Sequence, residues 1–159
     1  MTTDVDIVVK LDLGYTPEAA VSGAVLIQTE YSTFLTFNAK KLAEDGFYHD
    51  AGTALVEFNR CLITKFGYPN DEALGGHPLA AKMQGAYDIY EVLNSSWAMQ
   101  LEQQNKVLFP NTGKWKSRHF IFTFHDSTFE CLADNLKLEI LNEPYETIFE
   151  RIAKHVVSE

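Results

Sequence analysis

Alternation of apolar and polar residues between positions 5 and 13 places the strongest constraint on the fold. Five apolar side chains share one parity of this segment, and three charged side chains share the other. Because successive side chains of a strand point to opposite faces, this period of two predicts a half-buried β-strand. Residues 24–29 and 33–37 predict two more strands, which a turn at residues 30–32 would join into a hairpin.

The middle of the chain fits more than one structure. Residues 38–52 show no sustained period and predict a loop. Residues 54–66 fit a helix that Gly67 would end, but they also fit two strands around a turn at residues 59–60. Their many Phe, Ile, Val and Thr residues favour the strands, since the neighbouring segments supply partners for pairing.

Helices and strands are both predicted in the second half. Apolar residues at three- and four-residue steps predict one long central helix over residues 87–105. Residues 118–133 predict a hairpin with its turn at 125–128, and residues 136–140 predict a further strand. Asn142 is expected to cap a C-terminal helix with one apolar face.

These elements predict a single globular domain over residues 1–159 of the α+β class. It would consist of a mainly antiparallel sheet with one long central helix and a C-terminal helix, and the helices would cover one side of the sheet. No linker, repeat or low-complexity tract divides the chain.

Composition and charge limit the possible partners. No apolar run approaches the roughly 20 residues of a membrane-spanning helix, and no basic-then-apolar stretch opens the chain, so a cytoplasmic location is expected. Thirteen Lys and Arg against 22 Asp and Glu give a net charge of −9. This charge repels phosphate backbones and anionic lipid heads, and we therefore expect neither nucleic acid nor a membrane as partner.

The chain contains two cysteines, Cys61 and Cys131. Their spacing fits no metal-finger pattern, and thiols stay reduced in a cytoplasmic protein. We expect two buried thiols that behave as small apolar residues rather than a disulfide.

The turn of the hairpin predicted over residues 118–133 carries a group of versatile side chains. His125, Asp126 and Glu130 would bring an imidazole and two carboxylates into a small volume. A carboxylate beside a histidine can fix its tautomer, as a general base requires. Turn chemistry alone also explains Asp126, since Asp side chains bond nearby backbone N–H groups.

A second polar segment carries Asp71, Glu72 and His77. If this segment meets the hairpin, these residues together with His125 and Glu130 would form a mixed imidazole and carboxylate site suited to zinc, manganese or iron. No close spacing such as His-Glu-x-x-His supports the site, and a polar loop bonded to its own backbone explains the same residues. The metal stays open, and no other cofactor is indicated.

Glu91 and Asn94 lie on the face of the predicted central helix that points away from the core. Such a face is usually solvated, but turned into a cleft it would offer hydrogen-bonding groups to a ligand. No phosphate-binding glycine loop, dinucleotide fingerprint or Gly-x-Ser-x-Gly motif occurs, so catalytic residues remain unassigned.

Four segments resemble those of a group of uncharacterised bacterial proteins. They are residues 67–72, 76–79, 91–97 and 119–130, which read GYPNDE, GHPL, EVLNSSW and HFIFTFHDSTFE. The likeness spans residues 55–133 and implies a bacterial origin and a shared fold. It implies no reaction.

The leading functional hypothesis is a domain that binds a small ligand or a protein partner through a polar site near residues 69–78, 91–95 and 125–130. Its expected binding residues are His77, Glu91, Asn94, His125, Asp126 and Glu130. One alternative is a metal-assisted hydrolase that uses His77, His125 and nearby carboxylates. Another is an acidic inhibitor or immunity-like protein that its charge steers to a basic partner.

Overall fold

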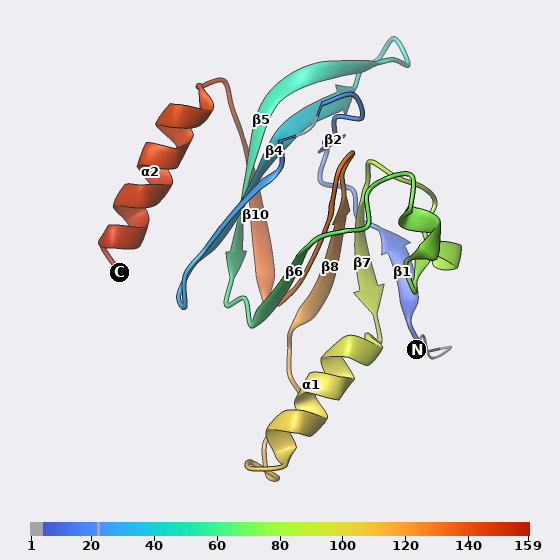
Figure 1. Cartoon of the computed structure of the whole chain (residues 1–159), viewed down its shortest axis with the longest axis vertical. Coiled ribbons are helices and arrows are strands. Elements are labelled where there is room, and N and C mark those ends of the chain that lie inside the picture. The colour runs from blue at the N-terminus through green and yellow to red at the C-terminus, as the bar shows by residue number, and fades with distance from the viewer. Residues whose placement is uncertain (1–4, 22) are drawn as a thin grey trace.

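A computed structural model describes residues 5–21 and 23–159, which form two antiparallel sheets packed face to face (Figure 1). The first, sheet A, contains in spatial order β1 (Ile7–Lys10), β7 (Ile89–Leu93), β8 (Arg118–Thr123), β9 (Thr128–Ala133) and β6 (Ile63–Gly67). The second, sheet B, contains in spatial order β10 (Asn135–Leu141), β5 (Tyr48–Asn59), β4 (Thr33–Leu42) and β2 (Thr16–Pro17), and β3 (Val25–Gln28) also pairs with β4.

The core lies between the two sheets and is dominated by phenylalanine. Phe120 and Phe122 on β8 and Phe129 on β9 point inward from sheet A and are completely buried. Phe37 and Phe58 meet them from sheet B, with ring centroids 5.2 to 6.1 Å apart. Aromatic rings bury large apolar areas, so these contacts hold the two sheets together.

Helix α2 (Tyr145–Val157) covers the outer face of sheet B (Figure 1). Its buried Ile148 and Ile152 pack against Phe34 and Leu55. The helix begins directly after Pro144, which occupies the N-cap position, so the prediction that Asn142 caps it is wrong. Pro144 serves here because its missing N–H is no loss at a helix start.

The prediction of an α+β fold with one long central helix is wrong. The residues assigned to that helix form strand β7 and the separate, shorter helix α1 (Ser96–Lys106). Asn94 breaks the two apart with a φ of 53°, and the Ser95 side chain accepts a hydrogen bond from the Ala98 N–H as the N-cap. The apolar residues at helical spacing belong in part to a buried strand and in part to a helix, so the spacing does not indicate one continuous helix.

The prediction of a loop over residues 38–52 is also wrong, because β4 and β5 extend through it as one long hairpin. Both strands become exposed toward the turn between them. A ribbon exposed on both faces has no need for alternating apolar residues, and this explains the missing period. The preferred interpretation of residues 54–66 as strands is confirmed, although β5 and β6 lie in different sheets.

The strand predicted over residues 5–13 is shorter, and its apolar face is not buried. Ile7 and Val9 on β1 are 47% and 37% exposed, whereas Val8 packs on the outer face of sheet A. Because β1 is an edge strand, sheet B does not fully cover its inward-facing residues. The hairpins predicted over residues 24–37 and 118–133 are confirmed.

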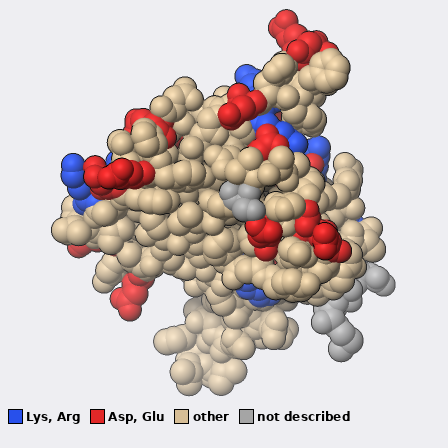
Figure 2. Space-filling model, turned by 45° about the horizontal axis from the view of Figure 1, so that its top comes forward, with Lys and Arg blue, Asp and Glu red and all other residues tan. Residues whose placement is uncertain are grey.

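No helix in the described ranges is long and apolar enough to span a bilayer. The acidic side chains lie in several separate places on the face that Figure 2 shows, without forming one continuous patch there.

Candidate ligand-binding site

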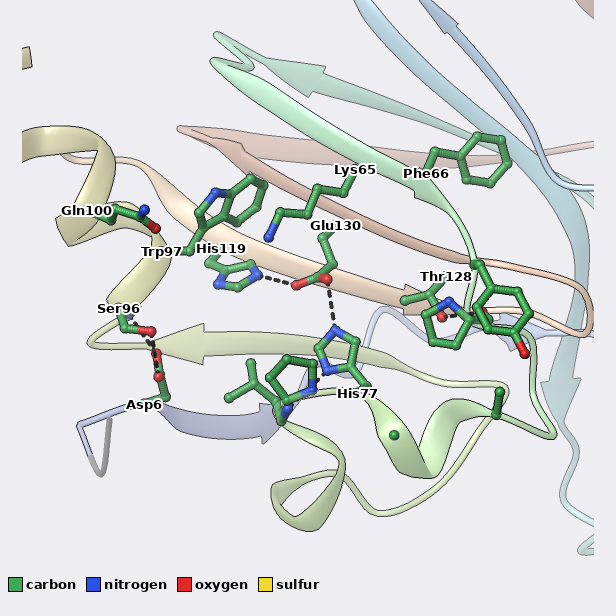
Figure 3. A pocket seen from close by; sticks show the side chains of 16 residues that line it. Asp6, Lys65, Phe66, His77, Ser96, Trp97, Gln100, His119, Thr128 and Glu130 are labelled. Atoms are coloured by element: carbon green, nitrogen blue, oxygen red, sulfur yellow. Dashed lines mark hydrogen bonds and ion pairs between the residues drawn. The ribbon is translucent and has the colours of Figure 1, made fainter. Parts of the chain in front are cut away.

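A cavity of about 1100 Å³ opens on the outer face of sheet A (Figure 3). Its floor consists of residues from β6, β8 and β9, and its walls come from the segment 68–79 and the first turn of α1. Small-molecule sites are usually concave and mostly apolar, with a few polar groups that converge on one point. This cavity has such a lining, since Tyr68, Pro78 and Leu79 lie around a polar centre.

The polar centre is Glu130, which points outward from β9 and is 8% exposed. Its Oε2 atom lies 2.8 Å from His77 Nε2, and its Oε1 atom lies 2.8 Å from His119 Nε2. Figure 3 shows the carboxylate between the two imidazole rings. A buried carboxylate requires such partners, because burial without hydrogen bonds is costly. We call His77, His119 and Glu130 the carboxylate clamp.

Neighbouring groups determine where each imidazole carries its proton. The Leu79 N–H donates to His77 Nδ1 over 3.0 Å, so the His77 proton must lie on Nε2. Ser95 Oγ lies 2.8 Å from His119 Nδ1 and also accepts from the Ala98 N–H. An ionised carboxylate can only accept, so both rings donate Nε2–H to Glu130.

The clamp keeps Glu130 ionised. Burial on its own raises the pKa of this carboxyl, but the hydrogen bonds from His119 and His77, together with electrostatic attraction to both rings, outweigh burial and lower its pKa to about 2. Hydrogen bonds to a charged group are among the strongest in proteins. Glu130 is consequently a fixed anion on the cavity floor at neutral pH, next to the cation of Lys65.

Lys65 and Trp97 form the side of the cavity next to Glu130. Lys65 on β6 stands directly opposite Glu130 in the antiparallel register, so both side chains share one face of the sheet. The Lys65 Nζ atom lies 3.9 Å from the centroid of the Trp97 ring, within the range of a cation–π interaction. Trp97 also contacts the His119 ring edge to face, with centroids 5.1 Å apart.

Asp6 holds helix α1 in place at the cavity. Its carboxylate accepts hydrogen bonds of 2.7 Å from both the backbone N–H and the hydroxyl of Ser96. A negative side chain is favourable at the first turn of a helix, where backbone N–H groups lack partners. Both carboxylate oxygens of Asp6 thus hold the start of α1, and with it Trp97, in place at the cavity.

The segment over residues 69–78 and the hairpin over 119–130 do meet. His77 bonds Glu130, and Asp71 Oδ2 lies 3.0 Å from His125 Nδ1. The Tyr87 hydroxyl also donates to Asp71. This hydrogen bond is the main cause of the lowered pKa of Asp71 and of the raised pKa of Tyr87.

The five residues considered for a metal are divided between two groups. His77 belongs with Glu130, His125 belongs with Asp71, and Glu72 is exposed. Within residues 5–21 and 23–159, no group of three or more His, Cys, Asp or Glu is arranged to hold a metal ion.

The other four predicted binding residues lie outside the cavity lining, and one of them, His125, pairs with Asp71 instead. Glu91 is on β7 opposite Phe120, on the inner face of sheet A, and forms an ion pair of 2.6 Å with Arg118. Asn94 is exposed between β7 and α1. Asp126 is in the hairpin turn, with Oδ1 3.9 Å from His125 Nε2.

Lys65, Trp97 and His119 line the cavity although they were not predicted as binding residues. The register of the hairpin contains a signal for one of them: His119 pairs with Leu132, two residues from Glu130, so the two side chains share a face. Lys65 and Trp97 reach the cavity from distant elements, and no local pattern indicates this.

Searches against protein families, curated proteins and solved structures find no match for this chain. The resemblance over residues 55–133 to uncharacterised bacterial proteins therefore stays a prediction.

Proposed function

We propose that this protein binds a small molecule in the cavity on the outer face of sheet A. The observation that carries the proposal is the carboxylate clamp, a fixed anion at the floor of a cavity with mainly apolar walls. The proposal retains the ligand-binding hypothesis for His77 and Glu130.

The clamp favours binding over acid–base catalysis. Both nitrogens of His77 and of His119 are engaged in hydrogen bonds, so neither ring is free to take a proton from a substrate. A general base works best with a pKa near the working pH, whereas the pKa of Glu130 is about 2. A weakly basic carboxylate still accepts hydrogen bonds well.

The chemistry of the lining indicates the ligand class. The carboxylate of Glu130 has about four lone-pair positions and its two histidines use two of them, so it can accept from a donor on the ligand. Trp97 and Tyr68 offer aromatic surface for a flat apolar group. We infer a ligand that combines an amine or other N–H donor with an aromatic or apolar body.

Phenethylamine and 3-phenylpropionate are suitable probes, because they share a phenyl ring and differ in the sign of their charge. We expect the amine to bind and to shift the NMR signals of the Trp97 indole, and the acid to bind at least about tenfold more weakly, since a hydrogen bond to a charged group is worth roughly 1.5–3 kcal/mol. Trp97→Ala should weaken binding of the amine. Glu91→Gln, on the opposite face of the sheet, should not.

Equal binding of the amine and the acid would contradict the proposal, as would amine binding that Trp97→Ala leaves unchanged. If millimolar phenethylamine does not shift the NMR signals of the Trp97 indole, the cavity is not the binding site of the amine.

A further inference from the structure

Two opposite charges lie in the cavity, and each contacts groups other than its opposite. Lys65 on β6 is directly across from Glu130 on β9, a position in which opposite charges usually interact favourably. Here both oxygens of Glu130 are held by His77 and His119, and the Lys65 Nζ atom lies 3.9 Å from the centroid of the Trp97 ring. The cavity therefore offers an anion and a cation to the same ligand.

The ammonium of Lys65 is available to a ligand. Within residues 5–21 and 23–159, no carboxylate forms an ion pair with Lys65. Its contact with Trp97 is an attraction to the ring face, which leaves N–H donors of the ammonium for other acceptors. Lys65 is also exposed, so its side chain can turn toward a ligand without breaking a buried contact.

The cation and the anion are close to each other. Figure 3 shows the Lys65 side chain between Trp97 and Glu130. Trp97 contacts both Lys65 and the His119 ring, and His119 in turn bonds Glu130. A ligand that meets both charges must therefore carry its own two charged groups a short distance apart.

We propose that the ligand of this cavity is a free α-amino acid with an aromatic or large apolar side chain. The inference rests on the proposed binding of a small molecule in the cavity, and it names the chemical class of that molecule. The ammonium of the amino acid donates to Glu130, and its carboxylate accepts from Lys65. Its side chain lies against the apolar walls of the cavity.

The net charge of the ligand supports a zwitterion. An amine without a carboxylate meets Glu130 but brings a like charge close to Lys65, and an acid without an amine brings a like charge close to Glu130. An α-amino acid gives each of the two protein charges an opposite partner and adds no net charge to the cavity. Its two charged groups are attached to one carbon atom, which satisfies the short separation.

The first test compares L-phenylalanine with L-phenylalaninol, which has a hydroxymethyl group in place of the carboxylate. Both carry an ammonium at pH 7, so the comparison isolates the carboxylate. Titration of the NMR signals of the Trp97 indole measures the two dissociation constants. L-phenylalanine should bind about fivefold more tightly, because an ion pair with an exposed lysine is worth up to about 1 kcal/mol.

The second test removes the cation. Lys65→Met should abolish the preference for L-phenylalanine, and it should leave binding of L-phenylalaninol equal or slightly tighter, since a like charge is gone. Lys137→Met is the matched control, because Lys137 is an exposed lysine directly opposite Glu57 in sheet B. This variant should retain the fivefold preference.

Equal binding of L-phenylalanine and L-phenylalaninol by the wild type would overturn the amino-acid proposal, as would a preference that persists in Lys65→Met. Either result together with binding of phenethylamine leaves the proposed function in place. If neither phenethylamine nor L-phenylalanine shifts the Trp97 indole, the proposed function fails, and the amino-acid proposal fails with it.

Discussion

Replacing Glu130 with alanine is expected to lower the free energy of unfolding by about 3–5 kcal/mol, the loss typical when one partner of a buried ion pair or charge network is removed. The His77 and His119 side chains are 7% and 3% exposed, and each would retain an Nε2–H without an acceptor. A buried donor without a partner costs far more than an ordinary hydrogen bond contributes. Urea unfolding at pH 7 measures the difference.

Glu91→Ala is the matched control, since it removes a carboxylate from the same sheet on the opposite face. Its partner Arg118 has a 36% exposed side chain and can be solvated after the change, so we expect a loss of about 1 kcal/mol or less. Similar losses for Glu130→Ala and Glu91→Ala would show that the clamp has no special importance for stability.

The same carboxylate should make stability fall in acid. Its pKa is about 2 in the folded protein against 4.5 for the unperturbed group. The stability that this carboxylate contributes is fully present above the pKa of the unfolded state and is lost as the pH falls to the pKa of the folded state. The expected loss is about 3 kcal/mol between pH 4.5 and pH 2. Unfolding of the wild type should show this loss, and Glu130→Gln should lack it.

Phe122→Ala is expected to cost about 3–5 kcal/mol, the usual range for removing a large aromatic side chain from a core. The Phe122 ring is fully buried and contacts the rings of Phe37, Phe58, Phe124 and Phe129 from both sheets. Removing it leaves a cavity at the centre of the sandwich. The midpoint of urea unfolding measures the loss.

Phe47→Ala provides the comparison, because Phe47 is 71% exposed at the turn of the hairpin of β4 and β5. We expect its stability to change by no more than about 0.5 kcal/mol. A loss for Phe122→Ala no larger than that for Phe47→Ala would contradict the assignment of the core to the space between the sheets.

The alternation of apolar and polar residues correctly predicted strand β10, whose burial also alternates. The hairpin of β8 and β9 follows from its turn and its Phe-rich sequence, although both of its faces are buried. The sequence pattern did not predict the strands over residues 38–52, where the hairpin is exposed on both faces and the period disappears. It also did not predict the break within residues 87–105, because Asn94, with a φ of 53°, separates a strand from a helix without interrupting the apolar spacing.

The site was predictable only in part. His77 and Glu130 were candidates because histidine and carboxylate side chains occurred in segments rich in turns. Their contact depends on the path of residues 68–79 over sheet A, which is a tertiary feature. Trp97 resembled a core residue by its helical spacing, yet α1 has no fully buried residue and presents this ring to the cavity.

The most direct test of the central claim is a two-bond ¹H–¹⁵N correlation spectrum of the histidine rings at pH 7, recorded with and without phenethylamine. We predict a proton on Nε2 of both His77 and His119, and changes in both Nε2–H signals when the amine binds Glu130, with none at the exposed His49. An Nε2 without a proton at either position would contradict the carboxylate clamp. Clamp signals that do not change with the amine would contradict its role in binding.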